Sequence, residues 1–198
     1  MDGAAGRPHS RPMPRYPETA GPIREAVPEG DNRPRLVCSE CGFVLYRNPK
    51  VVVGTVSSHE GKILLCRRAI APQRGFWTIP AGYLELGESA ESGALREARE
   101  EAHAEVAIDT LLALYSIPRI GQVQLIYRAR LLHPGIAPGH ESLEARLFDW
   151  GEIPWHELAF PSVRWALDHW LEMKDVAAFA PRQNPEGANP DYIAGRGA

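Results

Sequence analysis

The chain has 198 residues, and 22 Lys and Arg stand against 25 Asp and Glu, which gives a formal net charge of −3 at pH 7. This length allows one domain of ordinary size with appendages and excludes a large multidomain protein. The nearly balanced charge argues against nucleic-acid binding, and no apolar run approaches the roughly 20 residues that span a bilayer. With only three cysteines, we expect a cytoplasmic protein without nucleic-acid or membrane partners.

The two ends of the chain contain much proline and glycine. Residues 1–34 have almost no periodic apolar pattern, so they cannot bury enough surface to offset the entropy of ordering, and we predict a disordered arm. An organelle transit peptide is the alternative for this segment. Residues 179–198 are similar and are predicted to form a flexible tail. Between the ends we expect a short segment at 35–50 and the main domain at 51–178.

Two strands joined by a turn are predicted at the start of the main domain. Residues 51–56 are mostly β-branched, and the sequence His59-Glu60-Gly61 separates them from a second apolar run at 62–66. Residues 75–82 mix aromatic residues with glycine and proline, which indicates a short strand that runs into a loop. Loops held by strands often carry functional residues.

The clearest helix is predicted over residues 89–102, where Ala, Glu, Arg and Leu predominate. Ser89 or Glu88 is the predicted N-cap. Alanines at a spacing of four residues form a stripe that should pack against a close neighbour: Ala90, Ala94, Ala98 and Ala102.

The second half of the chain alternates strands with loops and ends in a helix. Residues 104–114 are predicted to be a strand, and the alternation of apolar and polar residues over 121–132 predicts a half-buried strand. Residues 133–144 form a long loop of the kind that is usually disordered or functional. A strand follows at 147–150, and an amphipathic helix at 162–178. Strands and helices are mixed, so the fold class is α/β or α+β.

Three carboxylates are predicted on one face of the first helix. Glu97, Glu100 and Glu101 are neighbours there because residues i, i+3 and i+4 lie close together on a helix. They would repel one another, unless hard divalent cations such as Mg²⁺ bind between them. Arg96 precedes Glu100 by four residues, so an ion pair could orient the acids. On these residues alone, a surface helix with ordinary ion pairs is the alternative.

The spacing around these acids resembles the Nudix box, G-x5-E-x7-R-E-U-x-E-E-x-G-U, in which U is aliphatic. Gly82 is followed at the required intervals by Glu88, Arg96-Glu97 and Glu100-Glu101. His103 departs from the pattern, because the family has glycine there. That glycine lets the chain leave the helix in a left-handed turn, so we expect His103 to strain or reshape this exit.

Three further segments, at 64–68, 75–85 and 137–144, resemble the plant FAD and ADP-ribose pyrophosphatase branch of this family and its bacterial relatives. The resemblance runs from about residue 28 to about residue 172. It implies the Nudix fold, an α/β/α sandwich with a mixed sheet, and often a homodimer.

The resemblance also implies an activity that depends on Mg²⁺ or Mn²⁺. The enzyme would cleave a nucleoside diphosphate linked to another moiety, ADP-ribose or FAD first, giving AMP and a phosphorylated product. The alternatives are NADH, a dinucleoside polyphosphate or a nucleoside triphosphate as substrate, or a sensor that binds a nucleotide sugar without turnover.

Metal ligands follow from the same resemblance. Glu97 and Glu101, one turn apart, would be the principal ligands. Glu100 would be a further ligand or would activate a bound water, and the Gly82 carbonyl would be a backbone ligand. All four positions belong to the box.

Candidates for the catalytic base and for substrate binding lie outside the box. In related ADP-ribose enzymes a base comes from a loop after the box, and here Glu144 is the first candidate and Glu141 the second. Arg68 could contact substrate phosphate or be an ordinary surface arginine. Trp77 could stack on a base or belong to the core. Glu85 is a further candidate for substrate contact.

A possible zinc site is predicted to be incomplete. Cys38 and Cys41, followed by a glycine, resemble one knuckle of a zinc ribbon and would supply half of a tetrahedral site. Related enzymes have a first cysteine pair, and here Pro17 and Ala20 stand in its place. Structural zinc is therefore not expected unless His9, another histidine or a second subunit completes the site. The alternative is a vestigial turn with free thiols.

Overall fold

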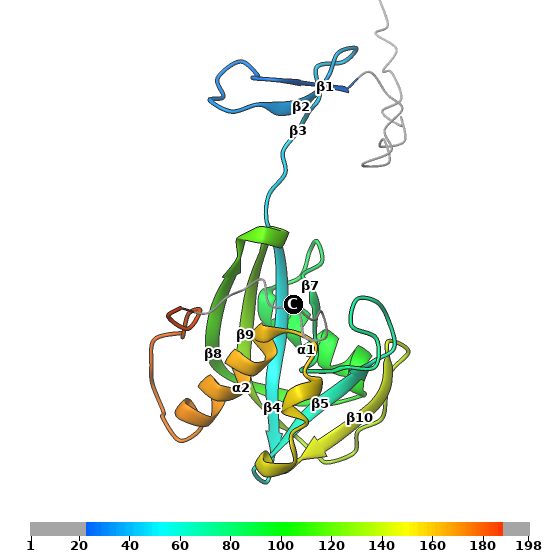
Figure 1. The fold of residues 1–198 in the computed structure, drawn as a ribbon, viewed down its shortest axis with the longest axis vertical. Coiled ribbons are helices and arrows are strands. Elements are labelled where there is room, and N and C mark those ends of the chain that lie inside the picture. Colours follow the sequence, from blue (N-terminus) through cyan, green and yellow to red (C-terminus); the bar gives the residue numbers. More distant parts are fainter. Residues whose placement is uncertain (1–22, 188–198) are drawn as a thin grey trace, which may run out of the picture. The chain divides into compact units, whose positions relative to one another are not determined.

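The computed structural model describes residues 23–187 and divides into two compact units, Met1–Asn48 and Pro49–Ala198. The first unit holds a three-stranded antiparallel sheet (Figure 1). Its strands, in the order β1-β2-β3, are β1 (Ile23–Ala26), β2 (Arg35–Cys38) and β3 (Val44–Leu45).

Strand β1 lies inside the segment that was predicted to be a disordered arm, so the ordered part begins earlier than expected. All four β1 residues pair with β2. The connection between the two strands is fixed by Asp31, whose carboxylate accepts hydrogen bonds from the backbone N of Asn32 and from Nε of Arg35. These local polar contacts hold a segment that has little apolar surface to bury.

The described part of the second unit, up to residue 187, contains a seven-stranded mixed sheet, two α-helices and three short 3₁₀ helices. The strands are β4 (Lys50–His59), β5 (Lys62–Arg68), β6 (Trp77–Thr78), β7 (Ala81–Tyr83), β8 (Val106–Ile117), β9 (Gln122–Leu131) and β10 (Ser142–Phe148). The α-helices are α1 (Ala90–Ala102) and α2 (Pro161–Met173). The 3₁₀ helices span Pro118–Ile120, Trp150–Glu152 and Trp155–Glu157.

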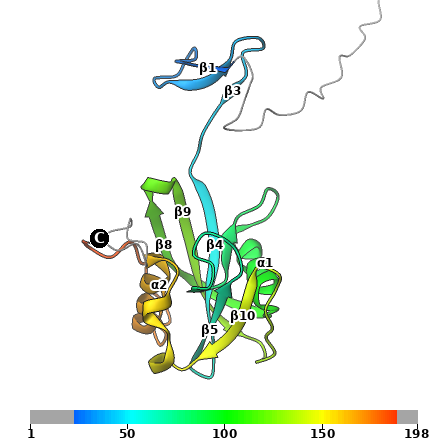
Figure 2. The same ribbon diagram turned by 45° about the vertical axis from the view of Figure 1, so that its right-hand side comes forward.

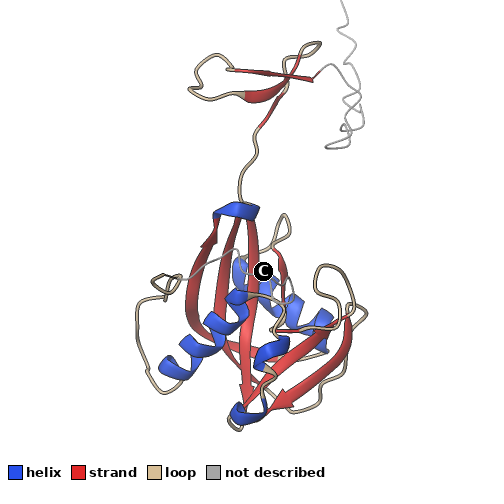
Figure 3. Cartoon of the chain, viewed as in Figure 1, coloured by secondary structure: helices blue, strands red, loops and turns tan. Residues whose placement is uncertain are grey.

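The strand order is β10-β5-β4-β9-β8, with β6 paired to β5 and β7 paired to β4. The long strands β4 and β9 are parallel, and the other pairs are antiparallel (Figure 3). The predicted α/β class with a mixed sheet is therefore confirmed.

The two α-helices cover opposite faces of this sheet (Figure 2). The alanine stripe of α1 packs against the sheet as predicted, because Ala94, Ala98 and Ala102 are fully buried and belong to clusters with residues of β4, β5 and β9. On the other face, apolar residues of α2 such as Trp165 and Leu167 join the largest core cluster. The result is the predicted α/β/α sandwich.

Helix α2 ends at Met173, five residues earlier than predicted, and a buried arginine of the sheet binds the chain at this end. Arg128 on β9 is 7% exposed and pairs with Asp109. Its guanidinium donates to the backbone oxygens of Met173, the last residue of α2, and of Val176 in the segment that follows. The polar side of β9 is thus covered at Arg128, whereas the sequence predicted that this whole side faces solvent.

Part of the predicted flexible tail is attached to β8. The backbone N of Arg182 donates to the oxygen of Leu112, and the backbone N of Leu114 donates to the oxygen of Arg182. Asn184 forms two hydrogen bonds with the backbone of Ser116. The segment therefore adds to the edge of the sheet. Among the described residues, no helix is long and apolar enough to cross a membrane.

Candidate active site

A cleft of about 730 Å³ opens in the second unit beside α1. Its lining comes from the acidic face of α1, from β7 and β9, from the loop at 70–73 and from the beginning of α2. The cleft contains all four metal-ligand candidates of the sequence analysis: Gly82, Glu97, Glu100 and Glu101. The helical spacing brings the three acids together as expected, and β7 brings Gly82 to them.

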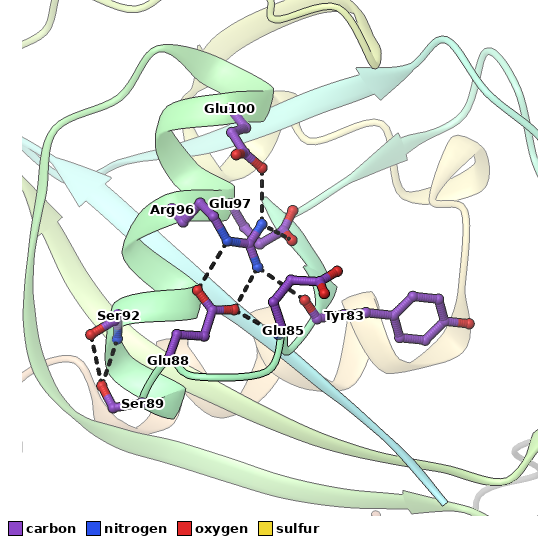
Figure 4. Close-up of polar contacts among 8 residues, drawn as sticks. All are labelled: Tyr83, Glu85, Glu88, Ser89, Ser92, Arg96, Glu97 and Glu100. Carbon is purple, nitrogen blue, oxygen red and sulfur yellow. Dashed lines mark hydrogen bonds and ion pairs between the residues drawn. The ribbon is translucent and has the colours of Figure 1, made fainter. Parts of the chain in front are cut away.

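Arg96 organises the acidic face (Figure 4). Its Nη1 donates to Glu97 Oε1 at 2.7 Å and to Glu100 Oε2 at 2.9 Å. Its Nη2 donates to Glu88 Oε1 at 2.8 Å and to the backbone oxygen of Tyr83 at 3.0 Å. The hydrogen bonds from Arg96 lower the pKa of Glu88 to about 2. One guanidinium thus links the loop before α1 to two of the three helix acids. The predicted ion pair between Arg96 and Glu100 is one of these contacts.

Two of the three acids of the helix face, Glu97 and Glu101, are buried. Glu97 is 8% exposed and Glu101 is 6% exposed. Burial raises the pKa of Glu101 to about 8, although the backbone N of Ala81 donates to Glu101 Oε2 at 3.0 Å. Burial also raises the pKa of Glu97, against the opposing effect of Arg96. A structure that buries two carboxylates so close together favours either protonation or a bound cation.

Gly82 is adapted to this pair of carboxylates. A side-chain Cβ at this position would lie 2.4 Å from Glu97 Oε1, so only glycine lets the carboxylate approach the strand. The donor set of carboxylate and carbonyl oxygens suits a hard divalent cation. Within residues 23–187, no three His, Cys, Asp or Glu side chains already form a metal-binding group. The fit of these residues to a divalent cation is therefore argued from the chemistry of the oxygen donors, from the burial of the two carboxylates and from the close contact at Gly82.

The exit of α1 has the left-handed conformation that the glycine of the box would favour. His103 has φ 47° and ψ 29°, and its backbone N donates to the oxygen of Arg99 at 2.9 Å. The predicted strain at His103 is therefore present, because a residue with a Cβ pays about 1–2 kcal/mol in this conformation.

We predict that His103→Gly raises the free energy of unfolding by about 1 kcal/mol, because the left-handed turn then costs little, although glycine also gains entropy in the unfolded chain. For a chain of this size the melting temperature should rise by about 2–4 °C, measured by thermal unfolding. His103→Ala is the matched control, because alanine keeps the Cβ. Equal melting temperatures of the two variants would contradict the strain at this position.

The loop at 133–141 docks on the carboxyl end of α1. The backbone N of Ala137 donates to the oxygen of Ala102, and the backbone N of Gly139 donates to the oxygen of Glu101, both at 3.0 Å. This docking brings His140 and Glu141 to the cleft. The negative charge of Glu141 contributes to the raised pKa values of Glu97 and Glu101, which reflects its closeness to both.

Glu144, the first candidate for the base, does not line the cleft. It lies on β10, paired with Arg67 beyond a bulge at Leu143, where the register shifts. Such a shift re-aims the following side chains, and the sequence gives no sign of it. The structure thus brings the second candidate, Glu141, to the acids instead of the first.

Two of the three candidates for substrate contact line the cleft, and the third does not. Arg68 and Glu85 line the cleft, and the Arg68 guanidinium lies 5.3 Å from the centre of the Phe160 ring. Trp77 belongs to the core: it is 6% exposed and packs edge-on against Phe148 with ring centres 4.9 Å apart. The assignment of Trp77 to substrate stacking is therefore corrected, because its ring is covered by the core.

Sequence reasoning missed the polar wall on the other side of the cleft. Gln122 and Gln124 of β9 line it together with Tyr83 of β7. The alternation along β9 did place both glutamines on the polar side of the strand, but it assigned that side to solvent. Only the packing of α2 above the sheet shows that this side faces a cleft.

The cysteine knuckle is formed in the first unit. Gly42 has φ 73°, and its backbone N donates to the oxygen of Cys38 at 2.9 Å. Hydrogen bonds from the backbone N of Cys41 and Glu40 and from the Cys41 thiol lower the pKa of Cys38. The described residues bring two thiols together and no third ligand, which is half of a tetrahedral zinc set. His9, Pro17 and Ala20 lie outside the described residues.

Comparison with known proteins supports the resemblance to Nudix proteins over most of the chain. The model of the NUDIX domain matches residues 47–172, and the model of the Nudix N-terminal zinc ribbon matches residues 17–47. A crystal structure of a NUDIX hydrolase from Nitrosomonas europaea has 44% sequence identity and a TM-score of 0.78, and the match covers 87% of this chain and 99% of that one.

Two curated proteins illustrate the range of relatives. An ADP-ribose pyrophosphatase of Methanocaldococcus jannaschii is 31% identical over 122 residues, which are 60% of this chain and 71% of the relative. An NAD-capped RNA hydrolase, NudC, of Pseudomonas aeruginosa is 28% identical over 152 residues. That match covers 75% of this chain but only 53% of the relative.

Proposed function

Because the chain belongs to the Nudix hydrolase family and is a pyrophosphohydrolase of that family, we propose that it hydrolyses ADP-ribose, with FAD as the second candidate, to AMP and a phosphorylated product. The observation that carries this proposal is the meeting of two buried acids, Glu97 and Glu101, with the close-packed Gly82 in one large cleft. The similarity to an ADP-ribose pyrophosphatase supports the choice of substrate.

We propose that Glu97, Glu101 and the Gly82 carbonyl hold Mg²⁺ or Mn²⁺, with Glu100 as a further ligand. When bound, the cation neutralises charge on the diphosphate and lowers the pKa of a bound water. The raised pKa values of Glu97 and Glu101 support this role, because the buried carboxylates need a positive partner to remain ionised.

The other residues of the cleft orient the substrate and accept a proton. Glu141 replaces Glu144 as our candidate for the base, because it lies at the cleft and its backbone is fixed by a hydrogen bond from the N of Ala69 to its oxygen. Arg68 supplies a positive charge beside the acids, where a phosphate oxygen would lie. Glu85, which is exposed and lines the cleft, is suited to a sugar hydroxyl.

A substrate panel tests this function. Purified full-length protein with Mg²⁺ is incubated with ADP-ribose, FAD, NADH, a dinucleoside polyphosphate and a nucleoside triphosphate, and the products are separated by chromatography. We expect ADP-ribose or FAD to release AMP fastest, and chelation of the metal to stop the release. Binding of ADP-ribose without turnover of any compound would identify a sensor and overturn the proposal. Faster cleavage of NADH than of ADP-ribose and FAD would overturn the proposed substrate and identify NADH in its place.

A further inference from the structure

The far side of the cleft from the acids has the composition of a nucleobase subsite. Tyr83 on β7, Val52 on β4 and Gln124 on β9 form one row across the sheet, since Val52 pairs with both of the others. Two strand spacings of about 4.8 Å each separate Tyr83 from Gln124. All three residues line the cleft.

A chain of hydrogen bonds links the polar side chains of this wall. Gln124 Nε2 donates to Gln122 Oε1 at 3.3 Å, and Gln122 Nε2 donates to the hydroxyl of Tyr83 at 3.4 Å. Both distances are long for hydrogen bonds, so the amides are weakly engaged with each other. Ile117 and Ile120 border the glutamines with apolar surface.

Tyr83 connects this wall to the acidic side. Its backbone oxygen accepts a hydrogen bond from Arg96, whereas its side chain extends away from the Arg96 network (Figure 4). Tyr83 is 46% exposed, and Lys50 Nζ lies 4.7 Å from the centre of its ring, so a base would stack on the ring face opposite Lys50. A ligand that spans from Gly82 along Tyr83 to the glutamines would therefore have its diphosphate at the acids and its base at the amides.

We infer that Gln122 and Gln124, with the ring of Tyr83, select adenine as the base of the substrate. This inference rests on the proposed hydrolysis of an adenosine diphosphate derivative. A glutamine amide pairs with adenine by accepting from its N6 amino group and donating to N7. Hypoxanthine has an oxygen in place of that amino group, so the pairing fails and a polar group is left unsatisfied.

The test compares adenine with hypoxanthine in both binding and turnover. Affinities for AMP and IMP are measured by calorimetry with Mg²⁺, and kcat and KM are measured for ADP-ribose and for its inosine analogue. The wild type should prefer the adenine compounds by about 10-fold or more. In Gln122→Met/Gln124→Met, which keeps the side-chain length, this preference should fall to about one, through KM rather than kcat.

Gln183→Met is the matched control, because Gln183 is exposed and does not line the cleft. It should keep the preference of the wild type. The two single variants replace the double variant if that one does not fold. A wild type that binds AMP and IMP equally, or a variant that keeps the preference, overturns the inference. If the protein bound AMP more tightly than IMP but did not cleave ADP-ribose, only the proposed substrate would be refuted.

Discussion

Glu101→Gln is expected to lower the rate of AMP release from ADP-ribose by about 100- to 1000-fold. The charge of this carboxylate would hold the divalent cation, and a metal ion stabilises the transition state of such reactions by several kcal/mol. The glutamine oxygen can still accept the hydrogen bond from the backbone N of Ala81 that Glu101 Oε2 now accepts. The measurement is kcat at saturating Mg²⁺.

The same substitution should not destabilise the protein. Burial raises the pKa of Glu101 from 4.5 to about 8, so the folded state disfavours the charged form. The stability that the protonated carboxyl provides is complete below about pH 4.5 and is lost as the pH rises toward 8. Without added metal, Glu101→Gln should therefore melt at an equal or higher temperature than the wild type at pH 8, with a smaller difference at pH 5.

Glu144→Gln is the control for this prediction, because Glu144 lies outside the cleft. Its activity should stay close to that of the wild type. If Glu101→Gln retained more than about a tenth of the activity, the role of Glu101 as a principal ligand would be refuted. A large loss of activity in Glu144→Gln would identify Glu144, instead of Glu141, as the base.

The acidic face could be predicted from the sequence because it depends on local geometry. The spacing of Glu97, Glu100 and Glu101 determines their positions on a helix whatever surrounds it. The conformation of His103 followed in the same way from its place at the helix end. Both features involve residues that are close in sequence.

Features that depend on the meeting of distant segments could not be predicted. Arg128 is buried because α2 covers its side of the sheet, and its partners at Met173 and Val176 are 45 and 48 residues away. The buried hydrogen bond between Tyr115 and His169 joins residues that are 54 positions apart. The choice between Glu141 and Glu144 depends on where the loop docks on α1.

Gly139→Ala should lower both the stability and the activity, because there is no space for a side chain where this glycine of the loop at 133–141 contacts α1. A Cβ at Gly139 would lie 1.6 Å from the backbone oxygen of Glu100, so the loop would have to move away from the helix. The hydrogen bond from Gly139 N to the oxygen of Glu101 would be lost. Such overpacking costs about 1–3 kcal/mol, which lowers the melting temperature by roughly 2–12 °C in a chain of this size.

Gly135→Ala in the same loop separates the clash from a general effect of alanine. At Gly135 the nearest atom to an added Cβ is Nδ1 of the exposed His133 side chain, at 3.1 Å, which can move aside. This variant should change the free energy of unfolding by no more than about 0.5 kcal/mol and keep its activity. If Gly139→Ala lost stability but kept full activity, the docking of the loop would serve the fold alone, and Glu141, two residues further on, would not be the base.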